Sequence, residues 1–192
     1  MANEGKLIIF SAPSGSGKTT IVKRLLSVFP QFEFSISATS RKPRGTERDG
    51  VDYIFLTQEE FARRVEAGDF VEWEEVYGGT CYGTLRSEME RIWAKGNVIV
   101  FDVDVMGGIN LKRIFGENAC SIFIMPPSVE ELRRRLEGRG TDSAETIDKR
   151  VAKAEFEISK SGSFDHIVVN DDLDTAVAET ESIIGKFLAA ER

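Results

Sequence analysis

A glycine-rich stretch near the N-terminus has the composition of a phosphate-binding loop. It runs from Ala12 to Thr19 (APSGSGKT) and lies between an apolar run and a helical pattern. Glycines allow backbone N–H groups to turn toward phosphate oxygens, and Lys18 can reach the terminal phosphates of a nucleotide. The Thr19 hydroxyl is a suitable ligand for Mg²⁺. Ala12 replaces the glycine that usually begins this motif, so we expect an ordinary backbone conformation there.

Two aspartates follow a second apolar run. Residues 98–101 (VIVF) lead into Asp102, and Asp104 comes two residues later. A carboxylate at the end of such a strand can hold a Mg²⁺-bound water in proteins that transfer phosphoryl groups. The alternative for either residue is a helix N-cap or a loop aspartate.

Basic residues are grouped although the chain is acidic. The net charge of −7 argues against a partner that is a long nucleic acid polymer, because such partners need extended basic surfaces. Small phosphorylated ligands suit local groups better, and the alternative is that each group is a solvated loop or helix face. One group comprises Arg41, Lys42, Arg44 and Arg48, and the other comprises Arg133, Arg134, Arg135 and Arg139.

Strand and helix patterns alternate along the chain, which predicts an α/β fold with parallel strands and crossover helices. Helices are expected to begin at capping boxes led by Thr57 and Ser128. They are expected to end near Gly68, Gly96, Gly116 and Gly138. The buried strands are predicted at residues 6–11, 97–102, 120–125 and 166–169, with a helix at 19–29 after the first.

Two segments interrupt this alternation, and we predict that both are appended to one domain. Residues 37–84 form an inserted lobe, with short antiparallel strands at 53–56 and 70–76. Residues 128–161 are helical and arginine-rich, which is typical of a mobile lid. The core would then comprise residues 1–36, 85–127 and 162–192 of a single domain spanning 1–192.

Composition indicates a soluble cytoplasmic protein. The chain is 41% hydrophobic and 30% charged, and no apolar run is long enough to span a membrane. The first residues lack the apolar region of a secretory signal, so we expect a cytoplasmic location. Cys81 and Cys120 are far apart and form no CxxC motif, which favours reduced thiols.

Longer motifs make the sequence resemble the guanylate kinase family over nearly its whole length. The S-x-x-x-R-x-x-R spacing that begins at Ser37, with Tyr53 further on, is more specific than the phosphate loop. The other matching segments are APSGSGKTT at 12–20, FVEWEEV at 70–76, YGT at 82–84, FDVDVMGG at 101–108, PPSVEELRRRLEGRGTD at 126–142 and VNDDLD at 169–174. The resemblance implies a P-loop nucleoside-monophosphate-kinase fold: a parallel sheet core flanked by helices, with a GMP-binding lobe and a helical lid.

The resemblance also implies the residues of an acceptor site for GMP. Glu72 suits guanine because a carboxylate can accept from both N1–H and the N2 amino group, a pair that adenine cannot offer. The guanine would face Ser37, Glu72 and Thr84, and the monophosphate would be held by Arg41, Arg44, Tyr53 and Tyr82. Asp102 is assigned to the acceptor site as well.

The resemblance to the family also implies the residues of a donor site for ATP. The resemblance implies that ATP binds Ala12, Pro13, Ser14, Gly15, Ser16, Gly17, Lys18, Thr19 and Thr20, with Asn170 near the adenine. Mg²⁺ would be held by Thr19 and, through water, by Asp104. The catalytic residues would be Lys18, Arg135, Arg139 and Arg150, because guanidinium forks neutralise approaching phosphates well. Arg133 and Arg134 are expected to be solvated surface residues.

The function that these patterns predict is reversible transfer of the ATP γ-phosphoryl group to GMP, and to dGMP, by a monomer or small homo-oligomer. Such a role would place the chain in purine nucleotide metabolism and GMP recycling. One rival is a kinase of the same fold that acts on a phosphorylated sugar, which would not need Ser37, Glu72 and Thr84 together. The other is a scaffold-type interaction module, which has usually lost the donor machinery that Lys18 and Thr19 represent here.

Overall fold

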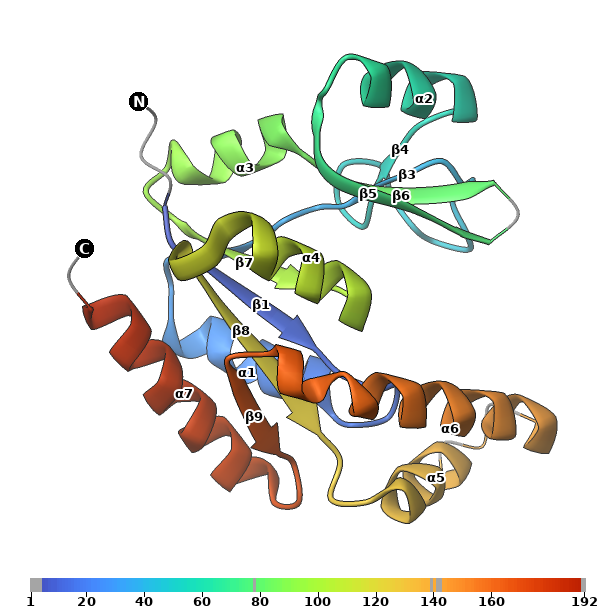
Figure 1. Cartoon of the computed structure of the whole chain (residues 1–192), viewed down its shortest axis with the longest axis vertical. Helices are drawn as coiled ribbons and strands as arrows, with labels where there is room; N and C mark the ends of the chain where they lie inside the picture. Colours follow the sequence, from blue (N-terminus) through green and yellow to red (C-terminus); the bar gives the residue numbers. More distant parts are fainter. Residues whose placement is uncertain (1–4, 78, 139, 141–142, 191–192) are drawn as a thin grey trace. The chain divides into compact units, whose positions relative to one another are not determined.

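The computed structural model describes residues 5–77, 79–138, 140 and 143–190 (Figure 1). Its chain divides into two units. The larger unit contains residues 6–32 and 101–192, and the smaller unit contains residues 1–5 and 33–100. The chain passes from one unit to the other within strands β2 (Phe32–Phe34) and β7 (Val98–Asp102).

Strands and helices alternate in the larger unit. Its strands are β1 (Leu7–Ser11), β8 (Ala119–Met125) and β9 (His166–Val169). Its helices are α1 (Lys18–Val28), α4 (Val105–Phe115), α5 (Val129–Gly138), α6 (Ala144–Ser159) and α7 (Leu173–Ala189), with short 3-10 turns at η1 (Gly116–Asn118) and η2 (Ser161–Ser163).

The sheet of the larger unit is parallel, as predicted. β1 pairs with β8 from Leu7↔Ala119 to Ser11↔Phe123, and β8 pairs in parallel with β9. The whole five-stranded sheet has the order β2-β7-β1-β8-β9. Every residue of β1 is buried, which explains its apolar run from Leu7 to Phe10, because a parallel strand is covered on both faces. In a parallel sheet the carboxyl ends of the strands lie at one edge. The loops that follow the strands therefore lie at that edge.

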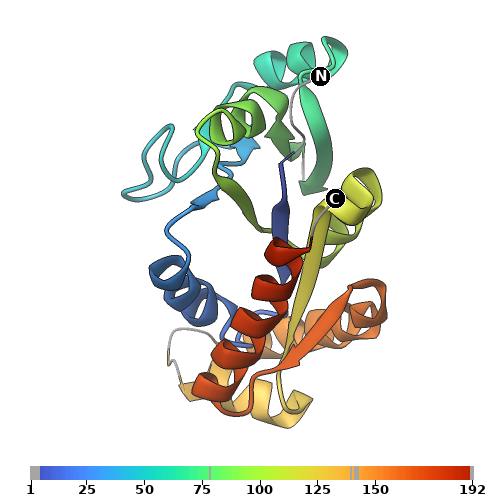
Figure 2. The ribbon, with the colours of Figure 1, turned by 90° about the vertical axis from the view of Figure 1, so that its left-hand side faces the viewer.

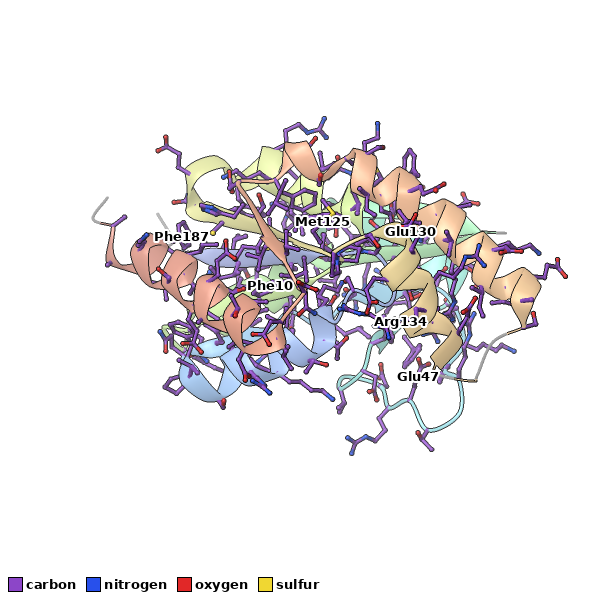
Figure 3. All side chains as sticks on the ribbon, turned by 90° about the horizontal axis from the view of Figure 1, so that it is seen from below. Phe10, Glu47, Met125, Glu130, Arg134 and Phe187 are labelled. Carbon is purple, nitrogen blue, oxygen red and sulfur yellow. The ribbon has the colours of Figure 1, made fainter. Side chains whose placement is uncertain are left out.

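Helices cover both faces of this sheet. Figure 2 shows α1 and α4 on opposite sides of β1. Helix α4 packs against β1 and β8, while α7 packs against α1 and β9. Phe10 is fully buried among the side chains between these layers (Figure 3).

Helices α5 and α6 lie side by side and have a small core of their own (Figure 1). That core consists of Leu132, Leu136, Ile147, Val151 and Ala154. The predicted cap at the start of α5 is present, because the Ser128 hydroxyl accepts from the backbone N–H of Glu131 at 3.0 Å.

The smaller unit is an α+β arrangement. Its strands are β3 (Ala38–Thr39), β4 (Ile54–Phe55), β5 (Phe70–Tyr77) and β6 (Thr80–Leu85), in the order β4-β3-β6-β5. Its helices are α2 (Gln58–Glu66) and α3 (Arg86–Trp93). The predicted cap of α2 is confirmed, because Thr57 accepts from the Glu60 N–H at 3.1 Å.

One strand direction was predicted wrongly. β5 and β6 are antiparallel as expected, but β4 pairs with β3 in parallel, with Ala38 opposite Ile54. The loop of residues 40–53 is long enough to bring the chain back to the same end of β3 before β4 begins. A short alternating run indicates a strand, but it does not indicate which way the strand runs.

Candidate active site

The phosphate-binding loop joins the end of β1 to the start of α1. Gly15 and Gly17 have φ values of +98° and +89°, a left-handed conformation that favours glycine. No other residue type has a positive φ in the described part of the chain, so Ala12 has the ordinary conformation that we expected. The hydroxyl of Ser16 donates to the carbonyl of Pro13 at 2.9 Å and closes the loop.

Lys18 begins α1 and extends toward the end of β7. Its ammonium group forms an ion pair with Asp102 and donates to the carbonyl oxygen of Val103 at 3.3 Å. The Lys18 side chain is 17% exposed and that of Asp102 is 35% exposed. The lysine is therefore held at the mouth of the loop by a partner from a neighbouring strand.

A cavity of about 400 Å³ opens over this loop within the larger unit. Most of the predicted donor-site residues line it, and it is also lined by Val103, Lys153 and Glu157, which the sequence analysis did not select. The predicted residues that line it are Ala12, Pro13, Ser14, Gly15, Gly17, Lys18, Thr19, Thr20, Asp102, Asp104 and Arg150.

Two predicted donor-site residues lie behind the loop. Ser16 is fully buried, and Asn170 is only 5% exposed. The Asn170 amide donates to the Ser16 carbonyl at 2.7 Å, and its backbone N–H donates to Met125 at 2.8 Å. Asn170 therefore supports the loop from β9, and the contact with adenine stays a prediction.

The oxygen ligands that the site offers fit a magnesium ion. Thr19 supplies a hydroxyl and Asp104 a carboxylate to the same cavity, and Mg²⁺ prefers oxygen ligands while keeping several waters and phosphate contacts. One Asp104 oxygen also caps α4 by accepting from the Gly107 N–H at 2.8 Å. Among the described residues no group of three or more His, Cys, Asp and Glu side chains is arranged to hold a metal.

Glu157 gives the cavity a buried carboxylate. It is 7% exposed, and burial raises its pKa, against the opposing effect of Lys153, whose ammonium lies 3.6 Å away. Lys153 and Glu157 follow Arg150 by three and seven residues, so all three belong to one face of α6. That spacing was visible in the sequence and could have identified both residues.

The three predicted lid arginines have different settings. Arg135 on α5 donates to Glu131 at 2.8 Å and to the carbonyl oxygen of Asn170 at 3.0 Å. Arg150 on α6 lines the cavity and lies 3.5 Å from the Ser14 hydroxyl. Arg139 lies outside the described residues.

The arginine cluster of α5 also includes the two residues predicted to be solvated. Arg134, labelled in Figure 3, is 78% exposed and pairs with Glu131. Arg133 is 42% exposed and pairs with Asp148 at 2.7 Å. Both are surface residues, as expected.

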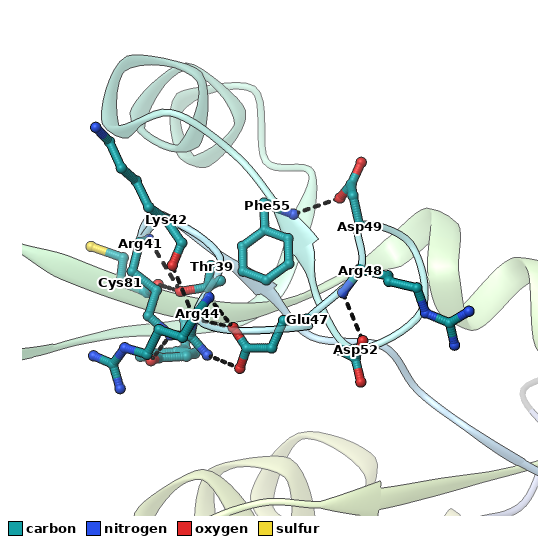
Figure 4. Close-up of polar contacts among 11 residues, drawn as sticks. Thr39, Arg41, Lys42, Arg44, Glu47, Arg48, Asp49, Asp52, Phe55 and Cys81 are labelled. Atoms are coloured by element: carbon teal, nitrogen blue, oxygen red, sulfur yellow. Dashed lines mark hydrogen bonds and ion pairs between the residues drawn. The ribbon is translucent and has the colours of Figure 1, made fainter.

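The predicted acceptor residues come together in the smaller unit. The Arg41 guanidinium lies 4.8 Å from the centre of the Tyr53 ring and donates through Nε to the Tyr82 hydroxyl at 3.0 Å. These three residues come from a loop, from the position just before β4 and from β6, and together they form a corner rich in N–H and O–H groups. Arg44 lies in the same loop (Figure 4). Phosphate is the ligand that such a corner suits best.

The residues predicted to read the base are also neighbours. Glu72 on β5 stands opposite Thr84 on β6, and the Thr84 hydroxyl donates to the Glu72 carboxylate at 2.8 Å. Thr84 is 1% exposed. Ser37 directly precedes β3, whose first residue, Ala38, pairs with Gly83. Because all three strands belong to one small sheet, the sheet brings a carboxylate and hydroxyls to one place.

Comparison with known proteins identifies the family. The family model for guanylate kinases matches residues 4–187. This chain belongs to the guanylate kinase family. It is 57% identical over 187 residues to a guanylate kinase from Bacteroides thetaiotaomicron, covering 97% of this chain and 92% of the relative. It is 55% identical over 185 residues to a guanylate kinase from Porphyromonas gingivalis, covering 96% and 98% of the two chains.

A solved structure supports the same conclusion. The crystal structure of guanylate kinase from Anaplasma phagocytophilum matches with a TM-score of 0.74 at 32% identity, over 97% of this chain and 87% of that one. The P-loop nucleoside-monophosphate-kinase fold is thus confirmed for this member of the guanylate kinase family, with a parallel sheet core flanked by helices.

The tight packing behind the phosphate loop leads to a first prediction for this guanylate kinase family member. In Gly17→Ala, the new Cβ would lie 2.2 Å from the Asn170 amide nitrogen, at a residue with a left-handed φ. We expect the free energy of unfolding to fall by about 2 kcal/mol or more, and ATP binding to weaken, because strain and a displaced hydrogen bond add together. Urea unfolding and ATP titration measure the two effects.

Gly185→Ala is the matched control. Gly185 lies in α7, and a Cβ there would meet open space. Alanine should leave stability unchanged or raise it slightly, because it favours helix over glycine. If Gly17→Ala were as stable as this control, the support that Asn170 gives to the loop would be unimportant.

Proposed function

We propose that this chain catalyses reversible transfer of the γ-phosphoryl group of ATP to GMP, giving ADP and GDP. The observation that carries the proposal is the Glu72–Thr84 pair, which lies in the same small sheet as Tyr82, the residue whose hydroxyl accepts from Arg41. A carboxylate can accept both the N1–H and the N2 amino hydrogens of guanine, so GMP satisfies Glu72 in a way that AMP does not.

The chemistry needs no general base, because the acceptor is already a phosphate anion. Catalysis then reduces to positioning and to neutralising charge on the travelling group. Lys18 and Arg150 line the donor cavity and supply positive charge there, and the glycine loop offers its backbone N–H groups to the donor phosphates. Mg²⁺ bound with ATP, held by Thr19 and through water by Asp104, would neutralise further charge on the phosphates.

Water must be excluded during transfer, since otherwise ATP would be hydrolysed. We propose that the lobe at 37–84 and the lid at 128–161 close over the core to exclude it. Arg135 and Arg139 would then join Arg150 at the travelling phosphoryl group, and Asp102 would exchange its partner Lys18 for a role at the acceptor site.

The proposal extends to the setting of the enzyme. We infer a cytoplasmic enzyme of purine nucleotide metabolism and GMP recycling, which acts on dGMP as well, binds no nucleic acid polymer, and works as a monomer or small homo-oligomer. No helix in the part of the chain that the structure describes is long and apolar enough to cross a membrane.

An ADP-release assay with a panel of acceptors tests the activity directly. GMP and dGMP should support turnover, whereas AMP, CMP and UMP should not. Turnover only with a phosphorylated sugar would favour the rival kinase, and GMP binding without any ADP release would favour an interaction module. The cavity that contains Lys18, Thr19 and Arg150 argues for turnover, because it presents the donor-site groups together.

Glu72→Gln tests base recognition. An amide can accept at one atom only and presents a donor where guanine also donates, so GMP should bind more weakly. We expect kcat/KM for GMP to fall by about ten- to a hundredfold and the preference over AMP to narrow. Initial rates with both acceptors measure the change.

Glu74→Gln is a matched control on the same strand. Glu74 is also part of β5, but it stands opposite Tyr82 rather than Thr84. The Glu74→Gln variant should leave the ratio of GMP to AMP rates close to that of the unmodified enzyme. Unchanged GMP kinetics in Glu72→Gln would show that Glu72 does not read the base.

A further inference from the structure

The loop that carries the phosphate-binding arginines is fixed by its own carboxylates. Asp49 accepts from the backbone N–H of Phe55 at 2.9 Å, and Asp52 accepts from that of Arg48 at 2.7 Å. Glu47 accepts from the N–H of Arg44 at 2.8 Å. Figure 4 shows these bonds around the loop. Within the part of the chain that the structure describes, Glu47 is the one of these three carboxylates that also binds an arginine side chain.

Glu47 and Arg41 form a bidentate ion pair. The Glu47 oxygens accept from Nη1 and Nη2 of Arg41 at 2.6 and 2.8 Å. The Arg41 side chain is 9% exposed and that of Glu47 is 25% exposed. Arg41 holds the pKa of Glu47 at about 2, with help from the Arg44 N–H, so Glu47 is ionised at any physiological pH. Both partners are therefore charged over the pH range in which an enzyme works.

Most N–H donors of the Arg41 guanidinium already have an acceptor. A guanidinium has five N–H donors. Four are used within the smaller unit: two on Glu47, one on the Tyr82 hydroxyl at 3.0 Å and one on the Lys42 carbonyl at 3.1 Å. The plane also packs against the Tyr53 ring. One N–H on Nη2 is left without a partner among the described residues.

We propose that Glu47 is a positioning residue for the acceptor phosphate, which fixes the Arg41 guanidinium and the Arg44 backbone so that both arginines are preorganised. In this arrangement Arg41 offers the phosphate one N–H in a fixed direction, and Glu47 balances the charge of Arg41. Arg44 supplies the net positive charge, because Glu47 balances only one of the two arginines. Glu47 also accepts from the Arg44 backbone N–H, and Arg44 is exposed. A preformed site binds more tightly, because fewer groups must be ordered when the ligand arrives.

This inference rests on the proposed GMP activity, since it assigns a role within the acceptor site. Glu47→Gln keeps the size of the side chain but places an amide donor against a guanidinium donor. We expect the KM and the dissociation constant for GMP to rise about tenfold, while kcat and the KM for ATP stay within about threefold, since a charge-assisted bond that orients Arg41 is lost. Glu47→Asp, which keeps the charge, should recover part of the loss.

Guanosine separates positioning from general damage. It has the base and sugar of GMP but no phosphate, so its affinity, measured by NMR titration, should be the same in Glu47→Gln and the unmodified enzyme. Glu60→Gln is the matched control, because Glu60 accepts from Arg63 and Arg64 on α2 of the same unit. It should leave GMP and guanosine binding unchanged.

Each other outcome overturns the inference. A lower KM for GMP would mean that Glu47 competes with the phosphate for Arg41. Equal losses for GMP and guanosine would mean that Glu47 only stabilises the lobe, and no change would mean that it has no part in binding. Failure of the proposed function is distinguishable, because it would appear as an unmodified enzyme that forms no ADP with GMP, whatever the titrations show.

Discussion

Lys18→Met should lower kcat by about 10³-fold or more while leaving GMP affinity nearly unchanged, because preorganised positive charge at the transferred phosphate is the main source of catalysis in phosphoryl transfer. Methionine keeps an unbranched stem of similar length but loses the ammonium group, which stands over the phosphate loop. The lysine belongs to the larger unit and the predicted guanine contacts to the smaller unit. Steady-state rates and GMP titration measure the two effects.

Lys23→Met is the matched control for this experiment. Lys23 lies on the exposed surface of the same helix, α1, so the identical chemical change there should leave kcat near that of the unmodified enzyme. Thermal unfolding of both variants shows whether the fold is intact. A Lys18→Met enzyme with more than a small fraction of normal turnover would contradict the assignment of the donor site.

Arg150→Ala should lower kcat at least about a hundredfold and change either KM much less, since an arginine that stabilises the transition state contributes 10³–10⁵ in related reactions. Arg150 comes from α6 into the donor cavity, next to the Ser14 hydroxyl. Arg150→Lys should behave more like alanine than like arginine, because an ammonium group cannot form the planar fork. Steady-state rates over a matrix of ATP and GMP concentrations separate kcat from the two KM values.

Arg133→Ala is the corresponding control. Arg133 lies on α5 and pairs with Asp148 of α6 at the surface, so its loss should have little effect on kcat. A normal kcat with a raised KM for ATP in Arg150→Ala would reassign Arg150 to holding the nucleotide. A near-normal rate in Arg150→Lys would show that positive charge alone is sufficient.

Much of the fold could be predicted because its signals are local. The largely apolar runs that became β1 and β8 are buried over almost their whole length, and a run without regular polar alternation is the pattern that such burial produces. The phosphate loop and the caps at Thr57 and Ser128 were predictable for the same reason, since each depends on residues within a few positions. The acceptor residues were predicted from family resemblance, because their spacing in the sequence does not show how they are arranged in space.

What could not be predicted depends on distant contacts. Asn170 supports the loop by donating to Ser16, which lies 154 residues earlier in the chain. The direction of β4 depends on the path of the loop of residues 40–53, which brings the chain back to the start of β3. The spacing of apolar residues does not indicate that path. Glu47 is close to Arg41 in sequence, but nothing in the sequence distinguishes a carboxylate that binds a guanidinium from one that faces water. Such partners emerge only when the chain is folded.

The pairing of Lys18 with Asp102 bears on which anions the phosphate loop can bind. Because its ammonium is matched by the Asp102 carboxylate, Lys18 would attract a small anion less strongly than an unpaired lysine would. A simple anion such as inorganic phosphate would have to separate the two groups and would gain only a single set of loop contacts in return. A nucleoside triphosphate brings three phosphates and a base, so it can offset the separation with many contacts at once. We therefore expect the ion pair to favour the binding of whole nucleotides over that of small anions.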